Sequence, residues 1–211
     1  MITDGIIFDV DGTLWDSTDC VATTWKNVIE KMNMKACIDV TAESLKSYFG
    51  KTMEVIADEI FPDETRERRI ELMDRCCEEE NEDLLALDEN LLYDGVRETV
   101  IELSKKVKVF IVSNCQKGYI EILLEKYDLN DYVTDIECYG NNGNGKAENI
   151  ELLVKRNNLK KPVYVGDTDG DKKACDEVGV PFIFATYGFG ETEGYVAKID
   201  SIKELLNIDN M

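Results

Sequence analysis

Aspartates lie where two apolar runs of the sequence end. Asp9 and Asp11 lie at the end of one run, and Asp167 and Asp171 lie at the end of another. Four carboxylates held close together repel one another, and a hard divalent cation relieves that repulsion. Magnesium prefers oxygen ligands and binds phosphate oxygens beside one or two carboxylates. The pattern predicts a magnesium site, and a carboxylate beside the metal can also act as a nucleophile toward phosphorus.

Other polar residues with suitable chemistry lie at comparable places. Ser113 and Asn114 end the apolar run VKVFIVSN, and Lys146 opens a helical pattern after the glycine-rich segment GNNGNG. A hydroxyl, an amide and an ammonium group can hold the oxygens of a phosphoryl group. GNNGNG lacks the Gly-Lys-Ser/Thr ending of a P-loop, so its composition predicts a simple loop. Asp11 is expected to protonate a leaving alkoxide.

The residue types that the chain lacks narrow the chemistry further. There is no histidine, which excludes serine–histidine–aspartate hydrolysis, cysteine–histidine proteolysis, phosphohistidine transfer and histidine-ligated zinc. Acid–base chemistry must therefore fall to carboxylates, lysine, tyrosine or cysteine. The seven cysteines are odd in number and form no C-x-x-C motif, so we expect reduced thiols and a cytoplasmic protein.

Composition restricts which class of protein the chain can belong to and which partners it can bind. The chain has 211 residues, of which 44% are hydrophobic and 32% are charged, and its net charge is -20. Such a chain is expected to be globular, and its charge argues against nucleic acid or an anionic membrane as a partner. No apolar run approaches the ~18 residues of a membrane span, and the N-terminal residues show no signal-peptide pattern. We expect a small-molecule substrate and either a monomer or a homodimer.

Apolar runs alternate with helical patterns in most of the chain. The predicted strands are 5–10, 107–114, 132–139, 162–167 and 180–188, and the predicted helices are 96–106, 118–127, 147–158, 171–179 and 201–208. This alternation predicts an α/β fold, a three-layer Rossmann-like core whose mainly parallel sheet is covered on both faces. Ligands of such sheets bind beyond the C-terminal ends of the strands, where the polar residues above would converge.

One long segment departs from this alternation. Between residues 15 and 88 only helical patterns occur, at 16–33, 42–48, 52–60 and 64–86. We therefore expect two domains, a core formed by residues 1–14 and 89–211 and an inserted all-helical domain formed by residues 15–88.

Four motifs together resemble those of the haloacid dehalogenase superfamily. They are DVDGT at 9–13, IVSN with Ser113, Lys146 before a helix, and GDTDGD with Asp167 and Asp171. The resemblance implies a Mg²⁺-dependent phosphatase that works through an aspartyl-phosphate.

The resemblance also implies a role for each site residue. Asp9 would be the nucleophile and a metal ligand. Asp11 would be the general acid and base, and its backbone carbonyl a further ligand. Asp167 would bind the metal directly, and Asp171 would act through water or by orienting its neighbours. The phosphoryl group would be held by Ser113 and Lys146.

The helical insert resembles the cap of the phosphoglycolate-phosphatase-like branch of that superfamily. LYDGV at 92–96 resembles the return to the core, with Asp94 where that branch usually has proline. The resemblance implies a cap that closes over the site, with Lys51 in its specificity loop, where it would pair with a carboxylate or second phosphate of the substrate. Asp169 matches no position of the superfamily.

Several functions share this scaffold. The favoured one is hydrolysis of a small phosphate monoester of the phosphoglycolate or sugar-phosphate type. A sugar phosphomutase would carry a cap histidine where this chain has Val21. A dehalogenase would need neither Asp11 nor the acids of the fourth motif, and a catalytically silent phosphate-binding protein would not need the full set of motifs.

Overall fold

The protein is described by a computed structural model that covers residues 3–210. The chain divides into two compact units, one formed by the residues up to Asp16 together with those from Leu91 onward, and the other formed by Ser17–Asn90. Residues 1, 2 and 211, which belong to the predicted core domain, lie outside the described residues.

The first unit is built on a parallel sheet with the strand order β3-β2-β1-β4-β5-β6. Its strands are β1 (Gly5–Phe8), β2 (Lys108–Ser113), β3 (Asp135–Cys138), β4 (Pro162–Gly166), β5 (Phe182–Ala185) and β6 (Ala197–Ile199). All the recorded pairings between neighbouring strands are parallel. The predicted α/β fold with a parallel sheet is confirmed.

The central strand β1 brings the site residues together. Phe8 of β1 is in register with Ile111 of β2 on one side and with Val165 of β4 on the other. Asp9 lies one residue beyond this level, and Ser113 and Asp167 lie two residues beyond it. The three residues therefore lie at or directly after the C-terminal ends of neighbouring strands, on the same side of the sheet.

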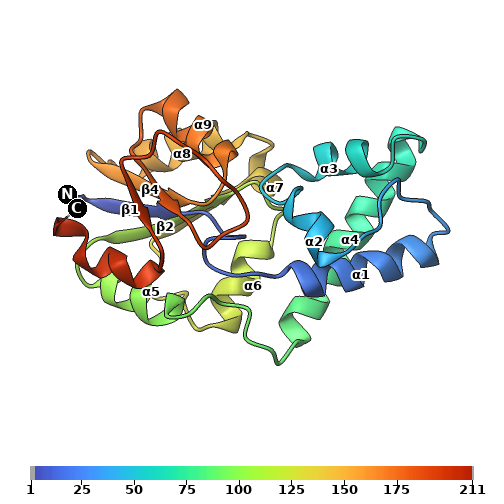
Figure 1. Ribbon diagram of the computed structural model, residues 1–211, viewed down its shortest axis with the longest axis horizontal. Coiled ribbons are helices and arrows are strands. Elements are labelled where there is room, and N and C mark those ends of the chain that lie inside the picture. The colour runs from blue at the N-terminus through green and yellow to red at the C-terminus, as the bar shows by residue number, and fades with distance from the viewer. Residues whose placement is uncertain (1–2, 211) are drawn as a thin grey trace. The chain divides into compact units, whose positions relative to one another are not determined.

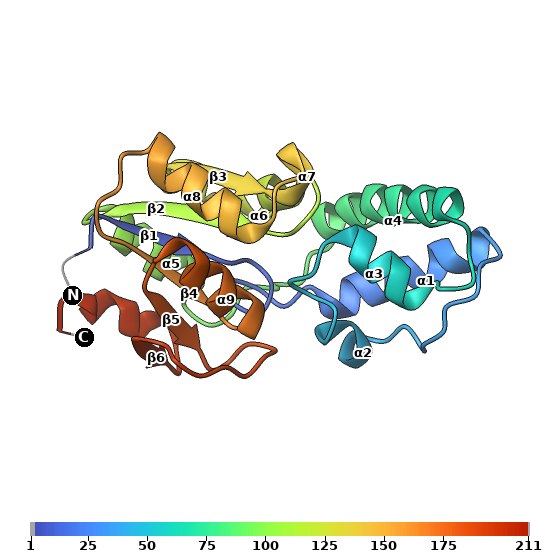
Figure 2. The ribbon, with the colours of Figure 1, turned by 90° about the horizontal axis from the view of Figure 1, so that it is seen from above.

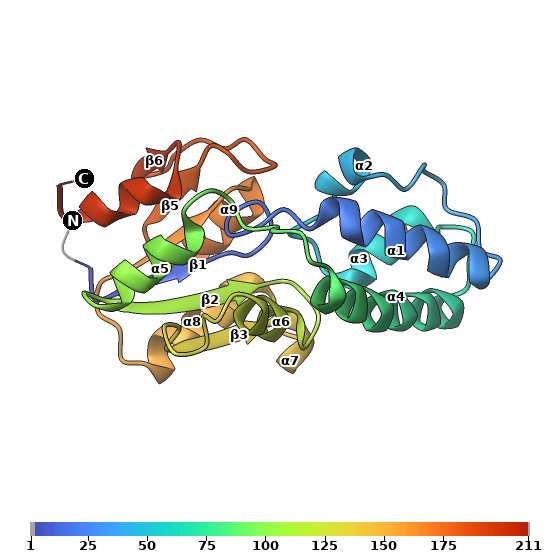
Figure 3. The ribbon, with the colours of Figure 1, turned by 90° about the horizontal axis from the view of Figure 1, so that it is seen from below.

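Helices cover both faces of the sheet (Figure 1). One face carries α8 (Lys146–Arg156) and α9 (Asp169–Val178), which lie in front of the strands in Figure 2. The opposite face carries α5 (Val96–Ser104), α6 (Tyr119–Lys126) and the 3₁₀ segment η1 (Ile202–Asn210), seen in Figure 3. The strands are almost completely buried, as expected for a parallel sheet between two helical layers.

The structure differs from the prediction in three elements. The short helix α7 (Tyr139–Asn142) takes the last residue of the predicted strand 132–139 and the first three residues of the predicted loop GNNGNG. It ends at Gly143 with φ +74° and is tied to α8 by a hydrogen bond from Asn142 to Asn149 of 2.9 Å. The strand β6 was not predicted, because three residues with an exposed Lys198 give too short a pattern. The predicted C-terminal helix is a 3₁₀ segment.

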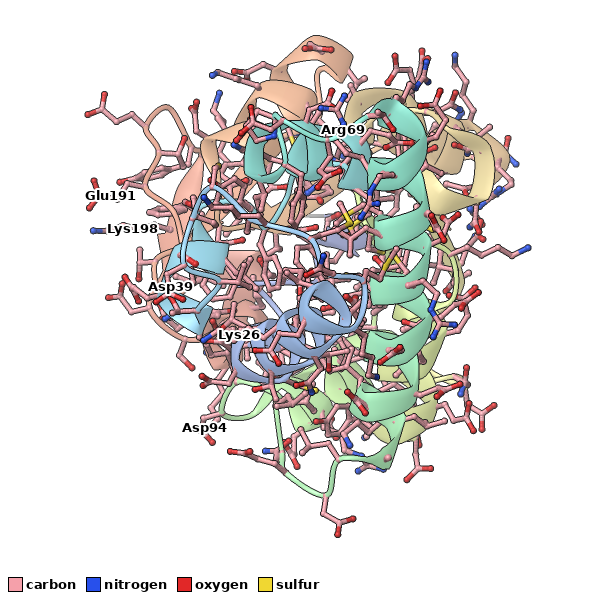
Figure 4. All side chains as sticks on the ribbon, turned by 90° about the vertical axis from the view of Figure 1, so that its right-hand side faces the viewer. Lys26, Asp39, Arg69, Asp94, Glu191 and Lys198 are labelled. Atoms are coloured by element: carbon pink, nitrogen blue, oxygen red, sulfur yellow. The ribbon has the colours of Figure 1, made fainter. Side chains whose placement is uncertain are left out.

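All the regular secondary structure of the second unit, residues 17–90, is helical. The helices are α1 (Thr18–Lys31), α2 (Ala42–Lys46), α3 (Met53–Ile60) and α4 (Arg66–Ala86). Trp25 of α1 is buried and donates a hydrogen bond of 2.7 Å to the buried Glu80 of α4, which ties the two longest helices together. Charged side chains project outward in Figure 4. Two of the labelled residues form an ion pair, with Lys26 Nζ 4.0 Å from Asp39 Oδ1. Among the described residues, no helix is long and apolar enough to cross a membrane.

We expect Ile7→Ala to destabilise the first unit by about 2–5 kcal/mol, because it removes a fully buried side chain from the central strand and leaves a cavity. Ile7 packs among the apolar residues between the sheet and the helices α8 and α9. The measurement is urea unfolding at equilibrium. The control is Leu152→Ala on α8, whose side chain is 38% exposed and which should cost less than about 1 kcal/mol. Equal losses for the two variants would contradict this assignment of the core.

Candidate active site

Three buried carboxylates form the centre of the site. Each of Asp9, Asp167 and Asp171 has an oxygen within 4.8 Å of an oxygen of the other two, and none of the three residues is more than 1% exposed. The parallel pairing of β1 and β4 brings Asp9 beside Asp167, and the backbone N–H of Asp9 donates to the carbonyl of Val165 at 2.9 Å. The sheet therefore assembles acids that lie more than 150 residues apart in the sequence.

A single ammonium group lies against this cluster in the described structure. Lys146 Nζ donates to Asp9 Oδ1 at 2.9 Å and to Asp171 Oδ1 at 2.5 Å. Lys146 is the first residue of α8, so the helix start delivers its side chain to the edge of the sheet. Burial lowers the pKa of Lys146, but the charges of Asp171 and Asp9 outweigh burial and raise it above its usual value. Lys146 therefore stays charged.

One ammonium does not balance the carboxylates. Burial, together with the charge of Asp171, raises the pKa of Asp9 to about 7. The same two causes and the charge of Asp9 raise the pKa of Asp167 to about 8. Burial and the neighbouring carboxylates thus both disfavour the ionised acids, and a bound cation would favour them.

Asp171 is held by hydrogen bonds from its own turn. Its Oδ2 accepts from the backbone N–H of Thr168 at 3.0 Å and from the Thr168 hydroxyl at 2.7 Å. The Thr168 hydroxyl in turn accepts from the backbone N–H of Asp171, which completes a capping box at the start of α9. Asp169 in the same turn is exposed and forms an ion pair with Lys173 at 2.7 Å. The structure thus separates Asp171, which is part of the site, from Asp169, which is a surface acid.

Asp167 is surrounded by groups that fix its orientation. Its Oδ1 accepts from the Thr13 hydroxyl at 3.2 Å, and its Oδ2 accepts from the backbone N–H of Phe189 at 2.7 Å. A Cβ at Gly12 would lie 2.1 Å from Asp167 Oδ2, and a Cβ at Gly188 would lie 2.4 Å from the same oxygen. Glycine at both positions keeps open the space around this carboxylate.

The site has the composition that a hard divalent cation requires. It offers carboxylate oxygens with raised pKa values, and it keeps space around Asp167 by means of two glycines. Oxygen donors of this kind suit magnesium, calcium or manganese rather than thiolate- or imidazole-seeking metals. The residues present therefore fit a divalent cation.

Asp11 lies in a different environment from the other acids. Its Oδ1 accepts hydrogen bonds from the hydroxyl of Tyr119 at 2.7 Å and from the indole N–H of Trp15 at 2.9 Å.

Ser113, at the end of β2, is buried, and Asn114 follows it. The phosphate-binding roles of Ser113 and Asn114 stay predictions.

Lys51 lies in the second unit and has a partner there. Its Nζ is 2.7 Å from Glu59 Oε2, and both side chains are more than a third exposed. Its ammonium also lies 5.0 Å from the centre of the Tyr48 ring. The predicted contact of Lys51 with substrate stays a prediction, and a substrate anion would have to compete with Glu59 for it.

Several residues that complete the site had no role in the sequence prediction. Thr13 lies inside the first motif, but a threonine after Asp-Gly is also typical of a turn, so its residue type did not indicate a contact with the site. Gly188 and Phe189 belong to the segment YGFG, which follows a predicted strand. Two glycines at such a place can indicate that the backbone passes close to another group, and this was the signal that the sequence offered. Trp15 and Tyr119 gave no signal, because their contact with Asp11 exists only in the folded chain.

Comparison with known proteins identifies the family. A sequence profile of the haloacid dehalogenase-like hydrolases matches residues 6–185. This chain belongs to that family. The membership confirms the predicted superfamily and the prediction of a hydrolase.

Individual relatives are similar over nearly their whole length. A phosphoglycolate phosphatase of Vibrio parahaemolyticus is 25% identical over 96% of this chain and 94% of its own. A phosphoglycolate phosphatase of Aquifex aeolicus is 25% identical over 87% of this chain and 85% of its own. The solved structure of a haloacid dehalogenase-like family hydrolase from Streptococcus pneumoniae superposes with a TM-score of 0.82 at 17% identity, covering 98% of each chain. The last likeness shows the fold, and the first two support a phosphatase within the family.

We expect Gly188→Ala to weaken binding of Mg²⁺ by about tenfold or more, since displacement of groups that orient a metal ligand typically costs 10–100-fold in affinity. The new methyl group would lie 2.2 Å from Asp167 Cβ and 2.4 Å from the carbonyl oxygen of Gly12. The measurement is isothermal titration calorimetry. Gly170→Ala is the matched control, because the nearest atom to its added methyl group is Thr168 Oγ1 at 3.4 Å. Unchanged Mg²⁺ affinity in Gly188→Ala would remove Asp167 from the proposed metal site.

The raised pKa values of Asp9 and Asp167 predict a pH dependence of stability. Folding raises both from 3.8, so the cation-free folded chain binds more protons than the unfolded chain from about pH 4 to about pH 8. Its free energy of unfolding should therefore fall as the pH rises through this range. Bound Mg²⁺ should displace these protons and flatten the dependence.

The measurement is urea unfolding at several pH values with chelator and with Mg²⁺. The chain contains no histidine, so no imidazole titrates in the same range. Asp9→Asn, which removes one of the two groups, should show a shallower fall. A chelated protein whose stability rises with pH across this range would refute the assignment.

Proposed function

We propose that this chain is a Mg²⁺-dependent phosphatase that hydrolyses a small organic phosphate monoester of the phosphoglycolate or sugar-phosphate type. The observation that carries the proposal is the buried cluster in which Asp9 lies beside Lys146, Asp167 and Asp171. Such a site would accept an anionic phosphoryl group once a cation has been added. The relatives named phosphoglycolate phosphatase support the same reaction class.

In the proposed first step, a carboxylate oxygen of Asp9 attacks phosphorus. A bond forms between this oxygen and phosphorus while the bond from phosphorus to the ester oxygen breaks, which leaves an aspartyl-phosphate. Asp11 gives its proton to the departing alkoxide. Lys146, Ser113 and Asn114 would hold the oxygens of the transferring group, with Lys146 already in hydrogen-bond contact with the nucleophile.

In the second step, water attacks the same phosphorus. Asp11, now a carboxylate, accepts a proton from that water, and the bond between Asp9 and phosphorus breaks to release inorganic phosphate. The two steps return both aspartates to their starting states, so the reaction consumes one water for each ester.

The cation would be held by Asp9, Asp167 and the backbone carbonyl of Asp11. When bound, Mg²⁺ would neutralise the charge between the carboxylate nucleophile and the phosphoryl oxygens. Asp171 would act by orientation, because its oxygens accept hydrogen bonds from Lys146 and Thr168. It would thereby fix the position of the ammonium group relative to Asp9.

The phosphomutase alternative has less support. Val21, at the place of the mutase cap histidine, is a buried apolar residue in the helical core of the second unit. It offers no hydrogen bond that would make the acid–base function of Asp11 depend on the bound sugar. A phosphoenzyme in this chain should therefore react with water.

The experiment measures release of inorganic phosphate from a panel of small phosphate esters, in Mg²⁺ and in excess chelator, with NMR of hexose phosphates alongside. We expect phosphate release that requires Mg²⁺, and a loss of several powers of ten in kcat for Asp9→Asn. The amide is nearly isosteric with the carboxylate but is no nucleophile.

The control variant is Asp169→Asn, which changes an exposed acid of the same sequence region and should leave kcat within about twofold. Near-normal kcat in Asp9→Asn, or full turnover without metal, would refute the mechanism. Interconversion of hexose phosphates faster than phosphate release would establish the mutase instead.

A further inference from the structure

Two aromatic side chains hold the carboxylate of Asp11. The hydroxyl of Tyr119 and the indole N–H of Trp15 both donate to Oδ1, at 2.7 and 2.9 Å. Trp15 is fully buried and Tyr119 is 2% exposed. Two good hydrogen bonds on one oxygen, from rings that are themselves packed in place, restrict both the position and the rotation of the carboxylate.

The backbone places each donor. The N–H of Gly12 donates to the carbonyl of Trp15 at 3.0 Å, and Gly12 has φ +79°, so a tight turn brings Trp15 back toward Asp11. Tyr119 is the first residue of α6 and follows Gly118, whose φ of +94° allows the chain to turn into the helix. The polar ends of the two rings therefore meet at one carboxylate.

The two rings also pack against each other. The ring centres of Trp15 and Tyr119 are 5.2 Å apart at an angle of 78°, and the ring centres of Trp15 and Tyr127 are 6.5 Å apart at an angle of 80°. Edge-to-face packing of this kind fixes aromatic rings. All of these residues belong to the unit that contains Asp9, so the orientation of Asp11 is set within that unit.

We propose that Tyr119, assisted by Trp15, is a positioning residue that aims Asp11 for proton transfer to the leaving group. The proposal rests on the phosphatase function proposed above. Because both donors engage Oδ1, the proton that Asp11 transfers is carried on Oδ2, and the two hydrogen bonds fix the direction in which Oδ2 points. In a chain without histidine, an aromatic pair thus supplies the orientation of the general acid.

This role predicts a dependence on the leaving group. An alkoxide is a poor leaving group and needs the proton of Asp11 as its bond to phosphorus breaks, whereas a nitrophenolate leaves with little assistance. The value of kcat/KM reports the steps up to and including this bond cleavage. A loosened Asp11 should therefore reduce kcat/KM for alkyl phosphates more than for aryl phosphates.

The test compares Tyr119→Phe with the unaltered chain on phosphoglycolate and on 4-nitrophenyl phosphate. We expect kcat/KM to fall by about tenfold or more for phosphoglycolate, since misplacement of a catalytic group by about 1 Å can cost far more. The fall for 4-nitrophenyl phosphate should be less than about threefold. Both substrates are measured on the same preparation, so the ratio does not depend on the fraction of folded protein.

Tyr127→Phe is the matched control. Its hydroxyl accepts from the backbone N–H of Leu91 at 2.8 Å, and its ring packs on the same tryptophan, so this variant removes a tyrosine hydroxyl from the same cluster but leaves the Asp11 contact. The ratio of the two kcat/KM values should stay unchanged in Tyr127→Phe.

The outcomes separate the two proposals. Equal losses on both substrates, or no loss on either in Tyr119→Phe, would overturn the positioning role and leave the phosphatase intact. If the unaltered chain releases no phosphate from either ester, the proposed function is overturned, and the positioning role with it. A selective loss for phosphoglycolate confined to Tyr119→Phe would support the role.

Discussion

The repulsion among buried carboxylates is the constraint on which the site depends. Asp9, Asp167 and Asp171 lie within a few ångströms of one another with almost no solvent exposure, and in the described structure Lys146 is the cation placed against them. Burial of unbalanced charge is costly. The fold tolerates it because Asp9 and Asp167 directly follow strands that are held firmly in the sheet, and Asp171 is fixed in the first turn of α9 by the capping box with Thr168.

The surrounding backbone is shaped to meet this constraint. Thr168 and Phe189 contribute hydrogen-bond donors that satisfy carboxylate oxygens, and Gly12 and Gly188 keep side-chain atoms away from Asp167. These groups orient the acids without neutralising them, so the excess of negative charge persists. In the proposed function, this site would bind a cation and, together with the cation, an anionic phosphoryl group.

Asp9 and Asp11, two residues apart in the sequence, have different surroundings. Asp9 faces an ammonium group and other carboxylates, whereas Asp11 faces the neutral donors of Tyr119 and Trp15. Different environments allow chemically identical groups to perform different tasks. In the proposed mechanism the first environment suits a nucleophile beside a metal ion, and the second suits a group that carries a proton.

The sequence alone predicted the fold class and the polar residues that gather at the site. The apolar runs and the motifs that follow them predicted the parallel sheet and the acids at its edge, because the burial pattern of strands and the types of polar residues are local properties. Only the tertiary structure decided which partners each acid has: Tyr119 meets Asp11, and the backbone N–H of Phe189 meets Asp167. These contacts join residues 108 and 22 positions apart, so they depend on how strands, turns and helices pack, and no pattern of neighbouring residues encodes them.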